Sequence, residues 1–202
     1  METASLSKLL KLPITAFLLI LLLGFPSSAF SEVKRGDGPS GMHSVWIYKT
    51  VCFDPMPDTA ALEKLATTYG FRPITGDALK AYAPGATAKY LKAWEVDDHG
   101  RTFKVSASVA DVDAQMAEQF PKFAKGSATG CTVILPAKDK PADVGAAMKV
   151  LTERDADTTY EAGPFNVTLW VGQTEQNVFL IYHYAPKSGQ PGGLLSIVTL
   201  AN

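Results

Sequence analysis

Three histidines and two cysteines are the side chains of this sequence that could do chemistry near neutral pH. His43, His99 and His183 lie far apart, and none belongs to an H-E-x-x-H or G-x-S-x-G motif. No phosphate-binding G-x-x-x-x-G-K-[ST] occurs, and no G-x-G-x-x-G follows a predicted strand. We therefore expect no metal and no cofactor. A Ser/His/Asp arrangement stays open, because its members need not be neighbours in sequence.

The two cysteines, Cys52 and Cys131, form an even pair, which in an exported chain is typical of a structural disulfide. Metal binding would need further Cys or His nearby, and a nucleophilic Cys would need a lowered pKa and a neighbouring base. We predict a bridge that closes a loop of about 80 residues and contributes up to about 4.5 kcal/mol in the chain-entropy picture.

A candidate binding face comes from two alternating apolar runs, Phe165–Val171 and Val178–Tyr184, joined by a short loop. If Val171 faces Val178, their side of the hairpin is wholly apolar and forms the core. The opposite side then carries Trp170 with Phe179, Thr168 with Ile181, and Asn166 with His183. That side is too apolar to be simply solvated. We expect either a helix or the leader to cover it, which we favour, or a binding patch formed by His183, Asn166, Trp170 and Phe179. In that patch His183 would be the titratable member.

The N-terminus has the pattern of a secretory signal peptide. Lys8 and Lys11 precede an apolar run over residues 12–25, and Ala29-Phe30-Ser31 supplies small residues before Glu32. A second cut could fall before Phe30. An uncleaved anchor is disfavoured, because the run is shorter than the roughly 18–20 apolar residues of a membrane span. We predict a signal peptide over residues 1–31, a periplasmic or secreted product, and no membrane span after cleavage.

Composition agrees with an exported globular domain. The chain has 202 residues, of which 47% are hydrophobic and 19% charged, with a formal net charge of −1. These values are globular, and the balanced charge argues against a nucleic-acid binder. We expect a flexible leader over residues 32–41 and a single domain over residues 42–202.

Helical periodicity is clearest over residues 58–69, where Asp58 can cap the helix and Gly70 can end it. Residues 42–53 carry both helix and strand signals, and we favour a helix there. A short helical turn is expected over residues 77–82. Further helices are expected over residues 112–123, interrupted by Pro121, and from Pro141 onward.

Residues 88–109 predict a hairpin that turns at His99-Gly100 and places Glu95 opposite Lys104. A loop over residues 126–130, a strand over residues 131–135 and three C-terminal strands complete the expected elements. This order predicts an α+β fold: an antiparallel sheet of about five to six strands, with N-terminal helices and one or two helices packed on it.

The segments Val51-Cys52-Phe53 and Pro57-Asp58 through Tyr69-Gly70-Phe71-Arg72-Pro73 resemble a pattern in small uncharacterised exported bacterial proteins with one disulfide. In these proteins a Cys, a helix ending in Gly-Phe or Gly-Trp, a hairpin and a second Cys on a strand recur. The resemblance covers most of residues 42–200 and implies export and a helix over residues 42–53. It implies no activity.

The sequence leaves three functions open. The first, which we favour, is a non-enzymatic domain that binds a protein or another envelope component. The second is an envelope hydrolase that uses His183 with an acid or Ser from elsewhere in the chain. The third is a small-ligand carrier, which would need an enclosed apolar cavity.

Overall fold

The computed structural model describes residues 41–82 and 88–202, all of which fall within one compact unit of the chain. The predicted signal peptide, residues 1–31, and all but the last residue of the predicted leader lie outside the described residues. Within the described ranges, no helix is both long enough and apolar enough to cross a bilayer.

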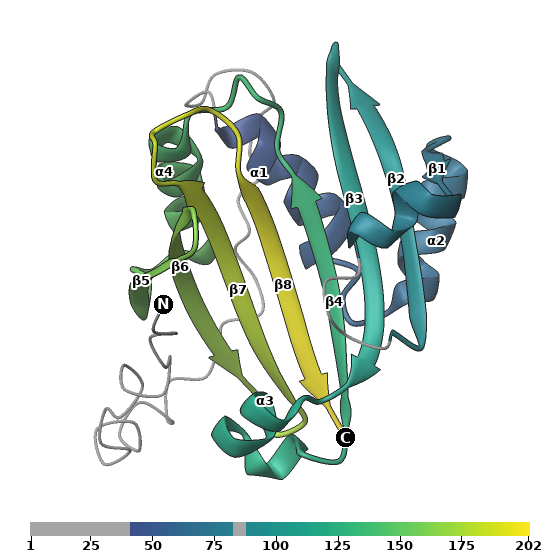
Figure 1. The fold of residues 1–202 in the computed structure, drawn as a ribbon, viewed down its shortest axis with the longest axis vertical. Coiled ribbons are helices and arrows are strands. Elements are labelled where there is room, and N and C mark those ends of the chain that lie inside the picture. Colours follow the sequence, from purple (N-terminus) through teal and green to yellow (C-terminus); the bar gives the residue numbers. More distant parts are fainter. Residues whose placement is uncertain (1–40, 83–87) are drawn as a thin grey trace. The chain divides into compact units, whose positions relative to one another are not determined.

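The centre of the fold is one antiparallel sheet of eight strands in the order β1-β2-β3-β4-β8-β7-β6-β5 (Figure 1). The mixed α+β class agrees with the sequence, but the sheet has eight strands and not five to six. The strands are β1 (Arg72–Ile74), β2 (Tyr90–Asp98), β3 (Arg101–Asp111), β4 (Ser127–Ile134), β5 (Thr158–Ala162), β6 (Phe165–Gln173), β7 (Asn177–Pro186) and β8 (Leu194–Ala201).

The two strands that the sequence did not predict are the two edges of the sheet. β1 has three residues and contains Pro73, and β5 alternates half-buried and exposed residues without a strongly apolar face. Both are short, polar edge strands, which carry little hydrophobic signal. The expected loop over residues 126–130 is also wrong, because β4 already begins at Ser127 and pairs with β3 and β8 from there.

The helices lie close to the positions that the sequence predicts. Residues 42–53 form a helix, as favoured, although its second half is a π-helix. Asp58 caps the helix that follows by accepting hydrogen bonds from the backbone N–H groups of Ala60 and Ala61. The bounds are α1 (Met42–Tyr48), π-helix η3 (Lys49–Phe53), α2 (Thr59–Thr68), 3₁₀-helix η4 (Gly76–Tyr82), α3 (Ala114–Gln119), 3₁₀-helix η5 (Pro121–Phe123) and α4 (Pro141–Thr152).

The β2–β3 hairpin has the predicted register, with Glu95 opposite Lys104 and Val96 opposite Phe103. His99 and Gly100 form its two-residue turn, and both have positive φ, 49° and 70°. A two-residue turn of this kind matches the twist of the flanking strands and leaves only one register for the pair.

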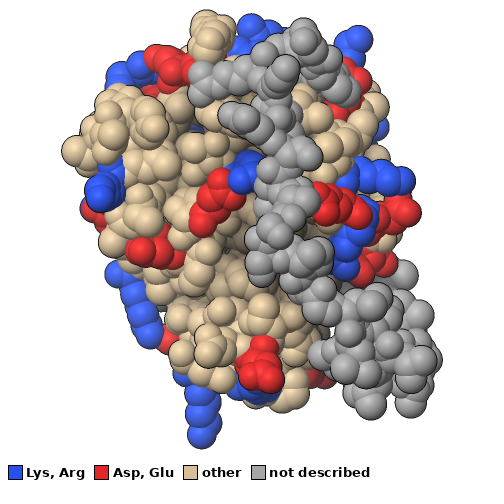
Figure 2. Space-filling view, turned by 180° about the vertical axis from the view of Figure 1, so that it is seen from behind, with Lys and Arg blue, Asp and Glu red and all other residues tan. Residues whose placement is uncertain are grey.

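The two faces of the sheet are packed differently. One face carries α1 and α4, which lie behind the strands in Figure 1, and the larger apolar core lies between these helices and the sheet. The opposite face, which we call the open face, carries a smaller core where α3 and η5 pack on β6, β7 and β8. Figure 2 shows the side with α1 and α4, where acidic and basic residues gather in small groups of mixed sign.

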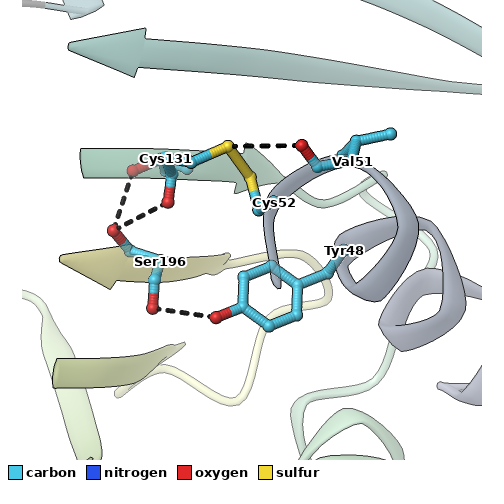
Figure 3. The surroundings of a disulfide bond; sticks show 6 residues. Tyr48, Val51, Cys52, Cys131 and Ser196 are labelled. Atoms are coloured by element: carbon cyan, nitrogen blue, oxygen red, sulfur yellow. Dashed lines mark hydrogen bonds between the residues drawn. A yellow bond between two sulfur atoms is a disulfide. The ribbon is translucent and has the colours of Figure 1, made fainter. Parts of the chain in front are cut away.

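A disulfide joins Cys52 of η3 to Cys131 of β4, as the cysteine count predicts (Figure 3). Both cysteines are fully buried. Tyr48, one turn earlier, donates a hydrogen bond of 3.2 Å to the carbonyl of Ser196 in β8. The N-terminal helix is thus fixed to two neighbouring central strands, one covalently and one by a buried hydrogen bond.

Candidate functional site

Most of the face proposed from the sequence is buried beneath helices. Trp170 is 2% exposed and His183 3% exposed, and both lie on the helix-covered side of the sheet. The indole N–H of Trp170 lies 3.4 Å from the carbonyl oxygen of Arg154, just after α4, and donates to it. Phe179 is partly buried against the same core, and Asn166 is exposed. The burial of Trp170 and His183 supports the covered alternative for these two side chains.

The register of the β6–β7 hairpin differs from the expected one. Gln173 pairs with Val178, and His183 lies opposite Thr168 and not opposite Asn166. The shift is two residues, so each side chain keeps its expected face while its cross-strand partner changes. His183 and Asn166 are therefore separated along the sheet and do not form one polar end.

His183 has an apolar environment beneath α4. Burial lowers the pKa of its imidazole to about 4. Its Nε2 has no hydrogen-bond partner among the described residues. A histidine with this pKa stays neutral at physiological pH and is a weak base.

The most polar buried cluster joins three distant segments at the tip of the β2–β3 hairpin. Arg101 Nη2 lies 2.9 Å from Asp139 Oδ1, and Asp139 is fully buried. Ser44 of α1, also fully buried, donates a hydrogen bond to Asp139 and accepts one of 3.2 Å from Arg101. The hydroxyl of Ser44 therefore both donates and accepts a hydrogen bond, and the cluster links α1, the hairpin and the loop before α4.

A second group of ionisable side chains lies beside it. His43 Nε2 and His99 Nδ1 lie 3.0 Å from the two carboxylate oxygens of Asp98. Burial lowers the pKa of His43, an effect that Asp98 partly offsets and Arg101 reinforces. Among the described residues, no group of three or more His, Cys, Asp or Glu side chains is arranged to hold a metal ion.

The open face of the sheet carries a row of hydroxyl groups that no local sequence pattern predicts. Ser106 of β3 lies directly opposite Thr132 of β4, Thr132 lies opposite Ser196 of β8, and Ser196 lies opposite Tyr182 of β7. Residues directly opposite each other share one face of a sheet, so four hydroxyl side chains cross four strands in a straight line. Thr132 Oγ1 and Ser196 Oγ are 2.9 Å apart, and Ser196 also donates to the carbonyl of Cys131.

Aromatic rings extend this row toward β6. The ring of Tyr184 lies 5.7 Å from that of Tyr182 and 6.0 Å from that of Phe165, which meets it edge-on. All three rings are half-buried, whereas Val167 beneath them is fully buried. Burial, reinforced by Tyr160, raises the pKa of Tyr184 to about 12, so its hydroxyl stays neutral at physiological pH.

A shallow pocket of about 310 Å³ lies at the other edge of the sheet, between α2, β1, η4 and β2, and is open to solvent. Its apolar lining comes from Ile74, Leu79, Leu91 and Trp94. The pocket is distant in the strand order from the aromatic rings of β6 and β7.

Comparison of the chain with protein-family models, with curated proteins and with solved structures gives no match.

Proposed function

We propose that the chain is an exported, non-enzymatic binding domain of the cell envelope, and that its binding surface is the open face of the sheet. The observation that carries this proposal is the line of hydroxyl groups from Ser106 to Tyr182, continued by the half-buried rings of Tyr184 and Phe165. Small amphipathic groups and aromatic rings on a rigid sheet are suited to binding, because they lose little conformational entropy.

The hydrolase alternative receives no support from the position of His183. Its imidazole is 3% exposed beneath α4, and its lowered pKa of about 4 makes it a poor general base at neutral pH. Ser44 is equally unsuited as a nucleophile, because it is fully buried and hydrogen-bonded to Asp139. The ionisable clusters hold the fold together, and this leaves the open face as the better candidate for recognition.

The proposal is tested by co-sedimentation of the mature protein, beginning at Glu32, with washed envelope fractions of the producing organism. Tyr184→Leu removes an open-face ring while keeping apolar cover over Val167. We expect it to weaken binding at least about fivefold. Tyr69→Leu is the matched control, since Tyr69 is 71% exposed and lies just after α2. Equal binding by both variants, or no binding by the unaltered protein, would contradict the proposal.

A further inference from the structure

The side chains on the open face indicate which chemical class of ligand this surface could bind. We call the following six residues the open-face patch: Ser106, Thr132, Ser196, Tyr182, Tyr184 and Phe165. None of them carries a charge at neutral pH, and five of the six carry a hydroxyl group. The patch therefore offers hydrogen bonds and apolar rings without an ionic component.

The geometry of the patch is regular. Neighbouring strands of a sheet are spaced by about 4.8 Å, so the residues of the row on β3, β4, β8 and β7 recur at about that interval, while the hydroxyl groups of Thr132 and Ser196 turn toward each other and lie 2.9 Å apart. They lie on backbone that is paired on both sides, because β4 and β8 are central strands. Ser196 is 8% exposed, and its hydroxyl is bonded to Thr132 and to the carbonyl of Cys131, so it acts mainly by holding Thr132 in place. A hydroxyl can donate and accept at once, so the half-buried hydroxyl groups of Ser106, Thr132 and Tyr182 can still bind a ligand that presents donors and acceptors.

The aromatic part of the patch adds an apolar surface next to this row. The ring of Tyr184 contacts both Tyr182 and Phe165, with ring centroids 5.7 Å and 6.0 Å away. Rings this close leave no room for a ligand between them, and they act as one continuous surface. Charged groups adjoin the patch at its rim: Lys104 precedes Ser106 on the same face of β3, and Asp113 lies near Tyr182.

From this arrangement we infer that the open-face patch binds a neutral, extended polysaccharide, with the hydroxyl row bonding sugar hydroxyl groups and the rings contacting the apolar C–H surface of the sugars. A sugar chain matches both halves of the patch, because each unit carries several hydroxyl groups and an apolar face. The six patch residues themselves offer no charged partner to the charges of an anionic polymer. This inference rests on the proposed function and names the class of envelope component that the domain would bind.

The test uses the mature protein and three defined probes in calorimetric titrations: chitohexaose and cellohexaose, which are neutral, and oligogalacturonate, which is anionic. We expect saturable binding of at least one neutral hexamer and none of oligogalacturonate. Excess neutral hexamer should also displace the protein from envelope fractions. Binding of oligogalacturonate alone, or of no probe, would overturn the inference.

Variants locate the binding on the patch. Tyr184→Leu should weaken hexamer binding about tenfold, whereas Tyr184→Phe, which keeps the ring, should lose less. Thr132→Val is nearly isosteric and removes one hydroxyl, and we expect a loss of about threefold to tenfold. Tyr69→Leu should leave binding unchanged. If Tyr184→Leu fails to fold, Thr132→Val and Tyr184→Phe decide the assignment. Unchanged hexamer binding by Thr132→Val and Tyr184→Phe together would then overturn the assignment to this face.

Failure of this inference and failure of the proposed function give different results. If the protein sediments with envelope but protease treatment of the envelope abolishes binding, the partner is a protein and the polysaccharide inference falls while the proposed function stands. If the protein binds neither envelope nor hexamer, both fall. A dimer seen by light scattering that Tyr184→Leu dissociates would assign the patch to a second copy and would overturn the inference.

Discussion

The imidazole ring of His183 lies directly beneath Gly145 of α4. A Cβ atom at position 145 would sit 3.8 Å from both Cε1 and Nδ1 of His183, which is ordinary van der Waals contact. A neutral polar ring, without a hydrogen-bond partner at Nε2 among the described residues, is thus enclosed between the central part of α4 and strand β7. This contact accounts for the burial of His183 beneath α4, and two predictions depend on it.

The first prediction concerns pH. Below pH 6.5 the unfolded chain binds a proton at His183 that the folded chain binds only near pH 4. The unfolded state is therefore favoured as pH falls through this window, and the free energy of unfolding should drop by about 3 kcal/mol between pH 6.5 and pH 4. His183→Leu should remove this part of the pH dependence. Urea melts of both proteins at pH 7, 5.5 and 4.5 measure the difference, and parallel pH profiles would contradict it.

The second prediction compares two glycines that differ in the space available for a side chain: a Cβ atom has room at Gly145 and would clash at Gly41. Gly145→Ala should stabilise the protein by about 0.5–1 kcal/mol, because alanine favours the helix and its methyl group has room. Gly41→Ala should destabilise it, because a Cβ atom there would lie 2.4 Å from the backbone of Asp143 at the start of α4. Thermal melts of the two variants should shift in opposite directions, and a loss of stability in Gly145→Ala would refute the described contact.

The third prediction concerns Trp170. Its side chain fills the core beneath the end of α4 and is 2% exposed. Trp170→Ala should cost about 3–5 kcal/mol, as for other buried aromatic residues. A change of less than about 1 kcal/mol in a denaturant melt would mean that the indole is not covered, and would favour the binding patch that the sequence alone allows.

The fourth prediction concerns the disulfide. Both cysteines are fully buried, so thiol reagents must be applied to the unfolded chain without reductant, and we expect no labelling. The double variant Cys52→Ala, Cys131→Ala should lose about 2–5 kcal/mol, because the bridge closes a long loop. Quantitative labelling of the unreduced, unfolded protein would show that the thiols are free.

Local signals in the sequence predict the fold well wherever one turn determines the geometry. The two-residue turn at His99-Gly100 leaves a single register for β2 and β3, and that register is confirmed. The β6–β7 loop shows the opposite case. Thr174 accepts hydrogen bonds at its hydroxyl from the backbone of Gln176 and Asn177, which tightens the loop and moves the pairing by two residues. Alternation fixes the face of each side chain but not its partner.

The candidate site was harder to predict, because its members come from five strands. Ser106, Thr132 and Ser196 each look like an ordinary polar position between buried neighbours, and only the sheet order brings them into line. The buried hydrogen bond from Ser44 to Asp139 likewise joins residues 95 positions apart, which no local pattern indicates. The sequence did reveal that two faces of the C-terminal strands are apolar. It could not reveal that helix α4 covers one of these faces and that α3 and η5 pack on part of the other.

The assignment of binding to the open face is tested most directly by NMR chemical-shift mapping of the mature protein during titration with solubilised envelope fragments. We expect chemical-shift changes concentrated on β3, β4, β7 and β8 around Thr132 and Tyr184, with α1 and α4 unaffected. Shifts concentrated on α1 and α4, with Thr132 and Tyr184 unchanged, would contradict it.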